Sequence, residues 1–175
     1  MGVDLRCDIK DGRPYVAAMR RDAKALLLLL GLKEAELSIT LTGDPEIHQL
    51  NRDFRGKDKP TDVLSFPQIE DDAVSRLATI KHEEDGPPLP LGDVVISLET
   101  ASRQAIAMRI APAERLRTLL IHGLLHLLGY DHERSLAEAR RMFARERELA
   151  AQLDHQPQTN NTSAAPKTRR VRARS

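Results

Sequence analysis

The sequence predicts an α+β fold, in which a mixed four-stranded sheet packs with about five helices in a single domain. The chain has 175 residues, the usual length of one domain, and 41% of them are hydrophobic, which is within the range of globular proteins. Apolar side chains alternate in several short segments, which is typical of strands, and recur at helical spacing in longer ones. No helical pattern connects the third and fourth expected strands, which favours an antiparallel pair in the sheet.

The first half of the chain is expected to contain two strands and two helices. They are, in order, a strand over 3–9, a helix over 15–30, a strand over 37–41 and a helix over 44–54. Pro14 and Gly31 suit the two ends of the first helix. Asp44 suits the N-cap of the second helix because Pro45 follows it at the first helical position.

The second half is expected to contain two strands and three helices. They are, in order, a strand over 63–66, a strand over 93–97 and helices over 99–109, 112–128 and 136–153. Ser135 and Glu138 form a capping-box pattern for the last helix. Residues 55–60 form a charged loop, and the acidic segment 70–90, rich in Pro and Gly, is expected to be an exposed, mobile loop.

Charge is divided unevenly along the chain. Residues 156–175 contain five basic and no acidic residues, whereas the whole chain has a net charge of only +1. We therefore expect a folded domain over 1–155 and a basic, disordered tail over 156–175. The tail is either simply solvated or a nonspecific tether to RNA or the ribosome. Because the domain itself is acidic in sum, RNA binding there requires a local patch or a metal.

The sequence also predicts the cellular compartment. The longest apolar run, 25–30, is far shorter than the roughly 20 residues that span a bilayer, so no membrane partner is expected. Cys7 is the single cysteine and cannot form an internal disulfide. Both observations favour a cytoplasmic protein.

Three histidines in one short segment predict a metal site. His122 and His126 are four residues apart in a helical pattern, so they project from the same face of the helix. Gly129 then ends the helix and lets the chain bring His132 back as a third ligand. Three imidazoles leave one position of a tetrahedral Zn²⁺ open, as in catalytic sites. The remaining histidines are assigned no metal role; they are His48, His82 and His155.

The histidine spacing overlaps the signature of metzincin peptidases. That signature needs a glutamate directly after the first histidine as general base, and Gly123 stands there. The metal ligands are kept, but a peptidase would lack its proton acceptor.

Three motifs, in the same order, resemble those of the YbeY rRNA maturation factors. The run from His122 to His132, HGLLHLLGYDH, is similar to the family's H-G-x-L-H-L-x-G-Y-D-H. Residues 58–67, DKPTDVLSFP, resemble its D-x-P-T-D-V-L-S-F-P, and residues 92–97, GDVVIS, resemble its G-D-I-x-I-S. The likeness extends over about residues 35–150.

The resemblance implies a metal-dependent endoribonuclease specific for single-stranded RNA. It further implies a role in maturing the 3′ end of 16S rRNA and in ribosome quality control. The implied partners are rRNA, the small ribosomal subunit with its proteins, and an assembly GTPase. An arginine shortly before the D-x-P-T-D run matters for activity in the family, and Arg55 occupies that place here.

Several roles stay open on the sequence alone. Lys57 and Lys59 either extend a phosphate-binding patch around Arg55 or are simply exposed. Tyr130 and Asp131 either orient a ligand histidine or serve the turn after the helix. Two other functions compete with the nuclease: a noncatalytic ribosome-assembly factor with structural zinc, and a metallopeptidase.

Overall fold

Four strands form one sheet in the order β1-β2-β4-β3. The computed structural model describes residues 2–69 and 87–155, so the expectations for His82, for 70–86 and for the tail lie outside the described residues. The strands are β1 (Gly2–Cys7), β2 (Ala35–Thr42), β3 (Val63–Pro67) and β4 (Leu89–Ser97). β1 and β4 both run parallel to β2, whereas β3 pairs antiparallel with β4. The predicted mixed sheet with one antiparallel pair is confirmed.

Five α-helices surround the sheet in the described part of the chain. They are α1 (Val16–Leu29), α2 (Asp44–Arg55), α4 (Leu98–Met108), α5 (Pro112–Leu127) and α6 (Leu136–Asp154). A 3₁₀ helix (Lys10–Tyr15) precedes α1 and holds Pro14. None of the described helices has both the length and the apolar character needed to span a membrane.

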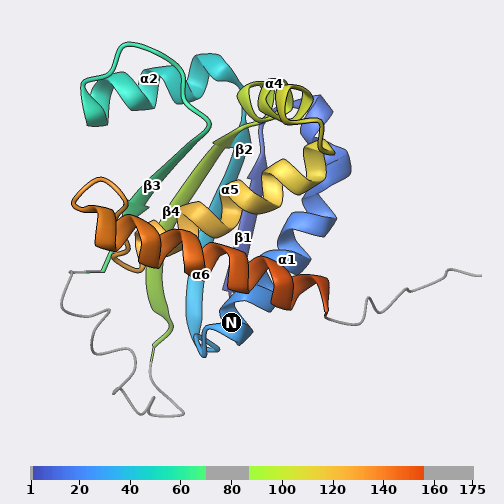
Figure 1. Cartoon of the computed structure of the whole chain (residues 1–175). Coiled ribbons are helices and arrows are strands. Elements are labelled where there is room, and N and C mark those ends of the chain that lie inside the picture. The colour runs from blue at the N-terminus through green and yellow to red at the C-terminus, as the bar shows by residue number, and fades with distance from the viewer. Residues whose placement is uncertain (1, 70–86, 156–175) are drawn as a thin grey trace, which may run out of the picture.

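The sheet is covered differently on its two faces. α1, α5 and α6 pack together on one face, where the main hydrophobic core lies between them and the alternating apolar residues of β1, β2 and β4 (Figure 1). α2 packs on the other face at the β3–β4 side, through a small cluster of Ile47, Leu64 and Val95. The strand alternation in the sequence therefore marks the face that meets α1 and α5.

The predicted boundaries differ from the observed ones where side chains have long-range partners. The N-cap of α2 is Gly43 rather than Asp44, because the Asp44 carboxylate accepts hydrogen bonds from Ser97 and Thr100 instead. β1 ends at Cys7, so the expected strand over 3–9 is two residues too long. β4 begins at Leu89, inside the segment predicted as a loop. The capping box of α6 is confirmed in part, since the Ser135 hydroxyl accepts from the Glu138 amide at 3.1 Å.

α5 lies very close to the sheet at Gly123. A Cβ on this residue would lie 2.6 Å from Val94 Cγ1 and 3.2 Å from both Ser65 Oγ and Val63 Cγ2. The Ser65 hydroxyl also donates to the Gly123 carbonyl at 2.9 Å. Residue 123 thus points into the packed layer between α5 and the sheet, and only a residue without a side chain fits there.

Candidate metal centre

The three predicted histidines converge. His122 and His126 lie one turn apart on α5, and Gly129 reverses the chain with φ +84°, a left-handed conformation that suits glycine. The ring of His132 then lies 5.1 Å, centroid to centroid, from each of the other two rings. One nitrogen of each ring belongs to a set whose members all lie within 4.8 Å of one another.

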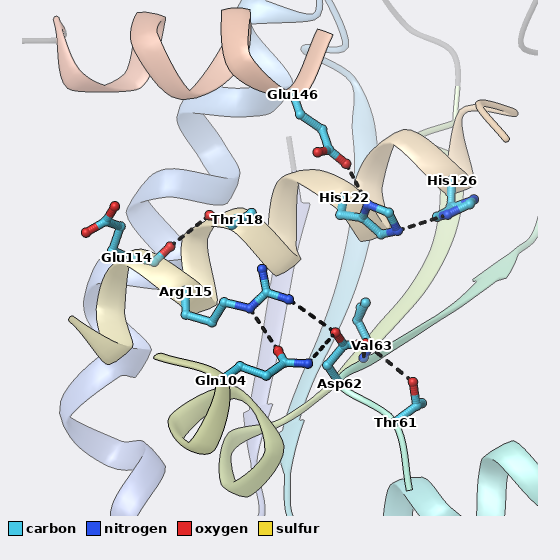
Figure 2. A network of polar contacts seen from close by, with 10 residues as sticks. All are labelled: Thr61, Asp62, Val63, Gln104, Glu114, Arg115, Thr118, His122, His126 and Glu146. Carbon is cyan, nitrogen blue, oxygen red and sulfur yellow. Dashed lines mark hydrogen bonds and ion pairs between the residues drawn. The ribbon is translucent and has the colours of Figure 1, made fainter. Parts of the chain in front are cut away.

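The donor set fits a zinc ion. Two nitrogens on one tetrahedral zinc lie about 3.3 Å apart, because each Zn–N bond is about 2.0–2.1 Å long. The Nε2 atoms of His122 and His126 lie 3.1 Å apart, and Figure 2 shows them facing each other. His132 Nδ1 is buried and has no hydrogen-bond partner among the described residues.

A carboxylate on α6 fixes the orientation of His122. Glu146 Oε1 lies 2.5 Å from His122 Nδ1, and both side chains are largely buried (Figure 2). A carboxylate only accepts hydrogen bonds, so Nδ1 carries the proton and Nε2 keeps a free lone pair. This carboxylate–histidine pairing is the usual support of a metal ligand.

The surroundings also favour the neutral form of His126. Burial lowers the pKa of His126, and the neighbouring rings of His122 and His132 lower it further. A neutral imidazole has the lone pair that binds a metal, so the shift of the His126 pKa favours its role as a ligand.

A hollow of about 790 Å³ joins the histidines to the predicted phosphate-binding residues. Arg55, Lys57 and Lys59 all line this hollow, which we call the metal groove. Arg55 is the last residue of α2, and its Nη2 lies 3.6 Å from Glu133 Oε2, next to His132 in the chain. The structure thus brings together all six residues that were predicted for the site.

Asn51 holds the basic loop in place. Its side-chain Nδ2 donates to the Lys59 carbonyl at 2.7 Å, and its main-chain carbonyl oxygen accepts from the Lys57 amide at 3.2 Å. The side chain is 1% exposed. The segment from Gly56 to Lys59 is therefore tied to the last turns of α2 by a buried amide.

Asp131 makes hydrogen bonds and an ion pair within the turn after α5. Its carboxylate accepts from the Glu133 amide at 2.8 Å and pairs with Arg134 at 3.1 Å. The Glu133 hydrogen bond lowers the pKa of Asp131, and the charge of Arg134 acts in the same direction. Asp131 therefore serves the turn. Tyr130 packs against the core, and Arg141 lies 5.7 Å above its ring.

A polar network anchors the start of β3 to α4 and α5. Asp62 Oδ2 accepts from Gln104 at 3.0 Å and from Arg115 at 3.2 Å, and Arg115 also donates to Gln104 at 2.8 Å (Figure 2). The other carboxylate oxygen of Asp62, Oδ1, accepts from the Val63 amide at 2.8 Å. Because Asp62 lines the metal groove, this network fixes the groove relative to the helix that carries two of the histidines.

Sequence reasoning missed Glu146, Asn51 and the Asp62 partners. Glu146 lies 24 residues from the histidine that it contacts. No local sequence pattern predicts such a contact, because it depends on how α6 crosses α5. The D-x-P-T-D run did mark Asp62, but only as a part of the resemblance.

Comparison with known proteins identifies the family. The family model described as endoribonuclease YbeY matches residues 14–154. The endoribonuclease YbeY of an Anaeromyxobacter species is 49% identical over 150 residues, which cover 86% of this chain and 71% of the relative. That of Geobacter sulfurreducens is 48% identical over 138 residues, which cover 78% of this chain and 85% of the relative.

A solved structure shares the fold. The solution structure of the Thermotoga maritima protein TM1509 superposes with a TM-score of 0.60, at 23% identity, and covers 96% of this chain and 99% of that one. This likeness supports the fold alone. On the match over 14–154 and on two relatives at nearly half identity, the chain belongs to the endoribonuclease YbeY family.

Proposed function

We propose that this protein is a zinc-dependent, single-strand-specific endoribonuclease that matures the 3′ end of 16S rRNA and acts in ribosome quality control in the cytoplasm. The proposed partners are rRNA, the small ribosomal subunit with its proteins, and an assembly GTPase. The observation that carries the activity is the convergence of three imidazoles and three basic side chains in one groove. The rRNA target and the partners follow from the family resemblance.

Different residues of the metal groove bind the metal and the RNA phosphates. A zinc ion, when bound by His122, His126 and His132, supplies Lewis acidity toward a phosphoryl oxygen and the attacking group. Arg55 holds the phosphate, because its planar guanidinium matches two phosphate oxygens and its charge stabilises those that develop in the transition state. Lys57 and Lys59 extend the positive surface along the RNA backbone.

Glu133 lies beside Arg55 at the rim of the metal groove. The two side chains lie 3.6 Å apart and are both well exposed, so their ion pair is weak and easily exchanged for a phosphate. Arg55 is thereby directed toward the histidines without being withdrawn from substrate.

The open donor set favours catalysis over the assembly-factor alternative. Structural zinc sites usually have four protein ligands. Among residues 2–69 and 87–155, the set at this centre comprises three histidines and no fourth His, Cys, Asp or Glu. The peptidase alternative is opposed by Gly123, since this position faces the sheet and has no space for the glutamate that a metzincin needs.

The first experiment compares wild type with His126→Ala. We expect about one zinc per wild-type chain, cleavage of single-stranded rRNA fragments, and loss of both metal and cleavage in the variant. Zinc bound to wild type without metal-dependent cleavage would instead support the assembly-factor function. Activity on a peptide panel would support the peptidase.

A second pair of variants tests Arg55. Arg55→Ala is expected to lower cleavage by roughly 10²–10³-fold, the usual effect of losing one charge-stabilising donor, with zinc content unchanged. Arg52→Ala is the matched control, because Arg52 lies on the same helix and pairs with Gln49 and Asp53 outside the groove. Loss of zinc in Arg55→Ala would show that the residue is structural.

A further inference from the structure

A second hollow adjoins the metal groove. It lies on the face of the sheet that carries α2. Its volume is about 300 Å³, and its lining comes from all four strands and from α2; the lining residues are Asp4, Arg6, Ser38, Thr40, Leu50, Phe54, Phe66, Asp93 and Val95. We call it the sheet hollow. Phe54 and Phe66 line both this hollow and the metal groove. The two rings therefore form the ridge between the two spaces.

The strand register explains the polar floor of the sheet hollow. Asp4 pairs with Ser38, Ser38 with Asp93, and Asp93 with Phe66, so one row of neighbours crosses the sheet from β1 to β3. Directly paired residues project from the same face. The row thus ends at Phe66, on which Phe54 rests.

Phe54 contacts another aromatic ring but leaves most of its surface open to solvent. Its ring meets Phe66 edge-on, with centroids 5.1 Å apart and an interplanar angle of 72°, yet the residue is 68% exposed. The next residue is Arg55, which lies in the metal groove. A ring held in this way offers a stacking surface one residue away from the proposed phosphate clamp. Bases of single-stranded RNA stack on such rings.

The two spaces differ in charge. The metal groove offers Arg55, Lys57 and Lys59 to a phosphate. The sheet hollow has two carboxylates, Asp4 and Asp93, and its one arginine, Arg6, pairs with Asp8 at 3.1 Å. Asp93 Oδ2 accepts from Gln68 at 3.1 Å, and a carboxylate has further lone pairs for a second donor. Carboxylates repel a phosphate but accept hydrogen bonds from the exocyclic amino groups of bases.

We propose that the sheet hollow binds the base of the nucleotide next to the scissile phosphate, with that base stacked on Phe54. Asp93 accepts from its exocyclic amino group, so cytosine and adenine bind better than uracil. Ser38 and Thr40 supply hydroxyls that donate or accept beside it. This inference rests on the proposed nuclease function and adds a base-binding subsite to it.

The test measures RNA binding by the full-length, metal-loaded protein. Fluorescent single-stranded oligo(C), oligo(A) and oligo(U) of roughly eight nucleotides are titrated at low temperature, and gels check that the RNA stays intact. Phe54→Leu is expected to weaken oligo(C) binding about tenfold, whereas Phe54→Trp keeps it. Asp93→Ala is expected to remove the preference for oligo(C) over oligo(U), measured as the ratio of the two affinities, because the lost negative charge changes both affinities alike.

Controls separate this inference from the proposed function. Ile106→Ala removes another exposed apolar side chain, 77% exposed on α4, and should leave binding unchanged. Circular dichroism checks that each variant is folded. Wild-type affinity in Phe54→Leu would overturn the base subsite while leaving the nuclease intact. Absence of RNA binding and cleavage in wild type would overturn the nuclease and the subsite together.

Discussion

At the scale of single residues, Glu146 decides which nitrogen of His122 a metal ion can reach. It lies on α6, and the histidine lies on α5, so the contact also links the two helices at the metal centre. Both side chains are mostly shielded from solvent, at 16% and 21% exposure, which strengthens the hydrogen bond. The orientation of the first ligand therefore depends on a residue far away in the sequence.

Replacing this carboxylate tests its role. Glu146→Ala is expected to weaken zinc binding about 10–100-fold, because His122 loses the partner that fixes its ring and its tautomer. Competition with a chromophoric chelator measures the affinity. Glu148→Ala is the control, since Glu148 lies on the same helix and pairs with Arg145 on the surface. Equal zinc affinity in both variants would contradict the role given to Glu146.

At the scale of secondary structure elements, the contact of α5 with the sheet limits what α5 can carry. Gly123→Ala is expected to lower the free energy of unfolding by about 1–3 kcal/mol, because the new methyl group overlaps Val94. At a helical position with free space, Gly→Ala usually raises the free energy of unfolding. A decrease would therefore by itself indicate the overlap. Denaturant unfolding measures it. In a Val94→Ala background, Gly123→Ala should cost less stability than in wild type if the overlap is the cause.

Asp44 joins α2 to α4 and makes this junction sensitive to acid. Burial would raise the pKa of Asp44, but hydrogen bonds from Ser97, Thr100 and Arg103, together with the charge of Arg103, outweigh burial and lower it. The pKa is lower in the folded than in the unfolded state. The carboxylate therefore stabilises the fold fully above its unfolded value of about 3.8 and loses this effect as the pH falls through the folded value.

The corresponding measurement compares wild type with Asp44→Asn at several pH values. Near pH 7 the variant is expected to be less stable by about 1–2 kcal/mol, because the hydrogen bond to Arg103 loses its charge. The difference should shrink as the pH falls below about 3.8. A difference that is independent of pH would show that hydrogen-bond geometry, rather than charge, accounts for the effect.

The sequence predicted most of the elements because their signals are local. Alternation, capping residues and the short histidine spacing all act over a few residues, so the strands, α6 and the metal ligands were expected. The first part of β4 was missed because Pro90 and Gly92 disfavour a strand. The structure tolerates Pro90 because the pairing with β3 ends at Gly92, and among the described residues only β2 pairs with β4 at Pro90.

The polar contacts of the site could not be predicted in the same way. Asp44 with Ser97 and Asp62 with Arg115 each join residues 53 positions apart. The partner of each carboxylate depends on how the helices pack on the sheet, and that arrangement is set by the whole core rather than by neighbouring residues. The resemblance to the family marked some of these positions but gave no partner.

At the scale of the whole molecule, the excess of basic over acidic residues lies in 156–175. The five basic residues of 156–175 exceed the net charge of +1 of the chain, so the remainder is negative in sum. The domain boundary at 155 and the tether function of the tail stay predictions, since the tail lies outside the described residues. Any gain in RNA affinity from the tail would be electrostatic and sensitive to salt.

Removing the tail tests the domain boundary at 155 and the tether function. A chain ending at His155 is expected to keep its zinc affinity and its thermal midpoint, because the residues of the metal centre all precede that point. Its RNA affinity should depend less on salt, with the slope of log K against log salt reduced by up to about 3.5, or about 0.7 for each lost contact. An unchanged slope would support a tail that is simply solvated.

The absence of a side chain at Gly123 limits the activities that substitutions could give to this domain. One substitution would place a glutamate beside the first histidine, as in a metzincin, but that side chain would have to enter the layer between α5 and the sheet. The helix would be displaced before any peptidase chemistry could be gained. In this domain the close approach of α5 to the sheet therefore excludes a glutamate at position 123, and a graft of peptidase activity would have to begin by moving α5 away from the sheet.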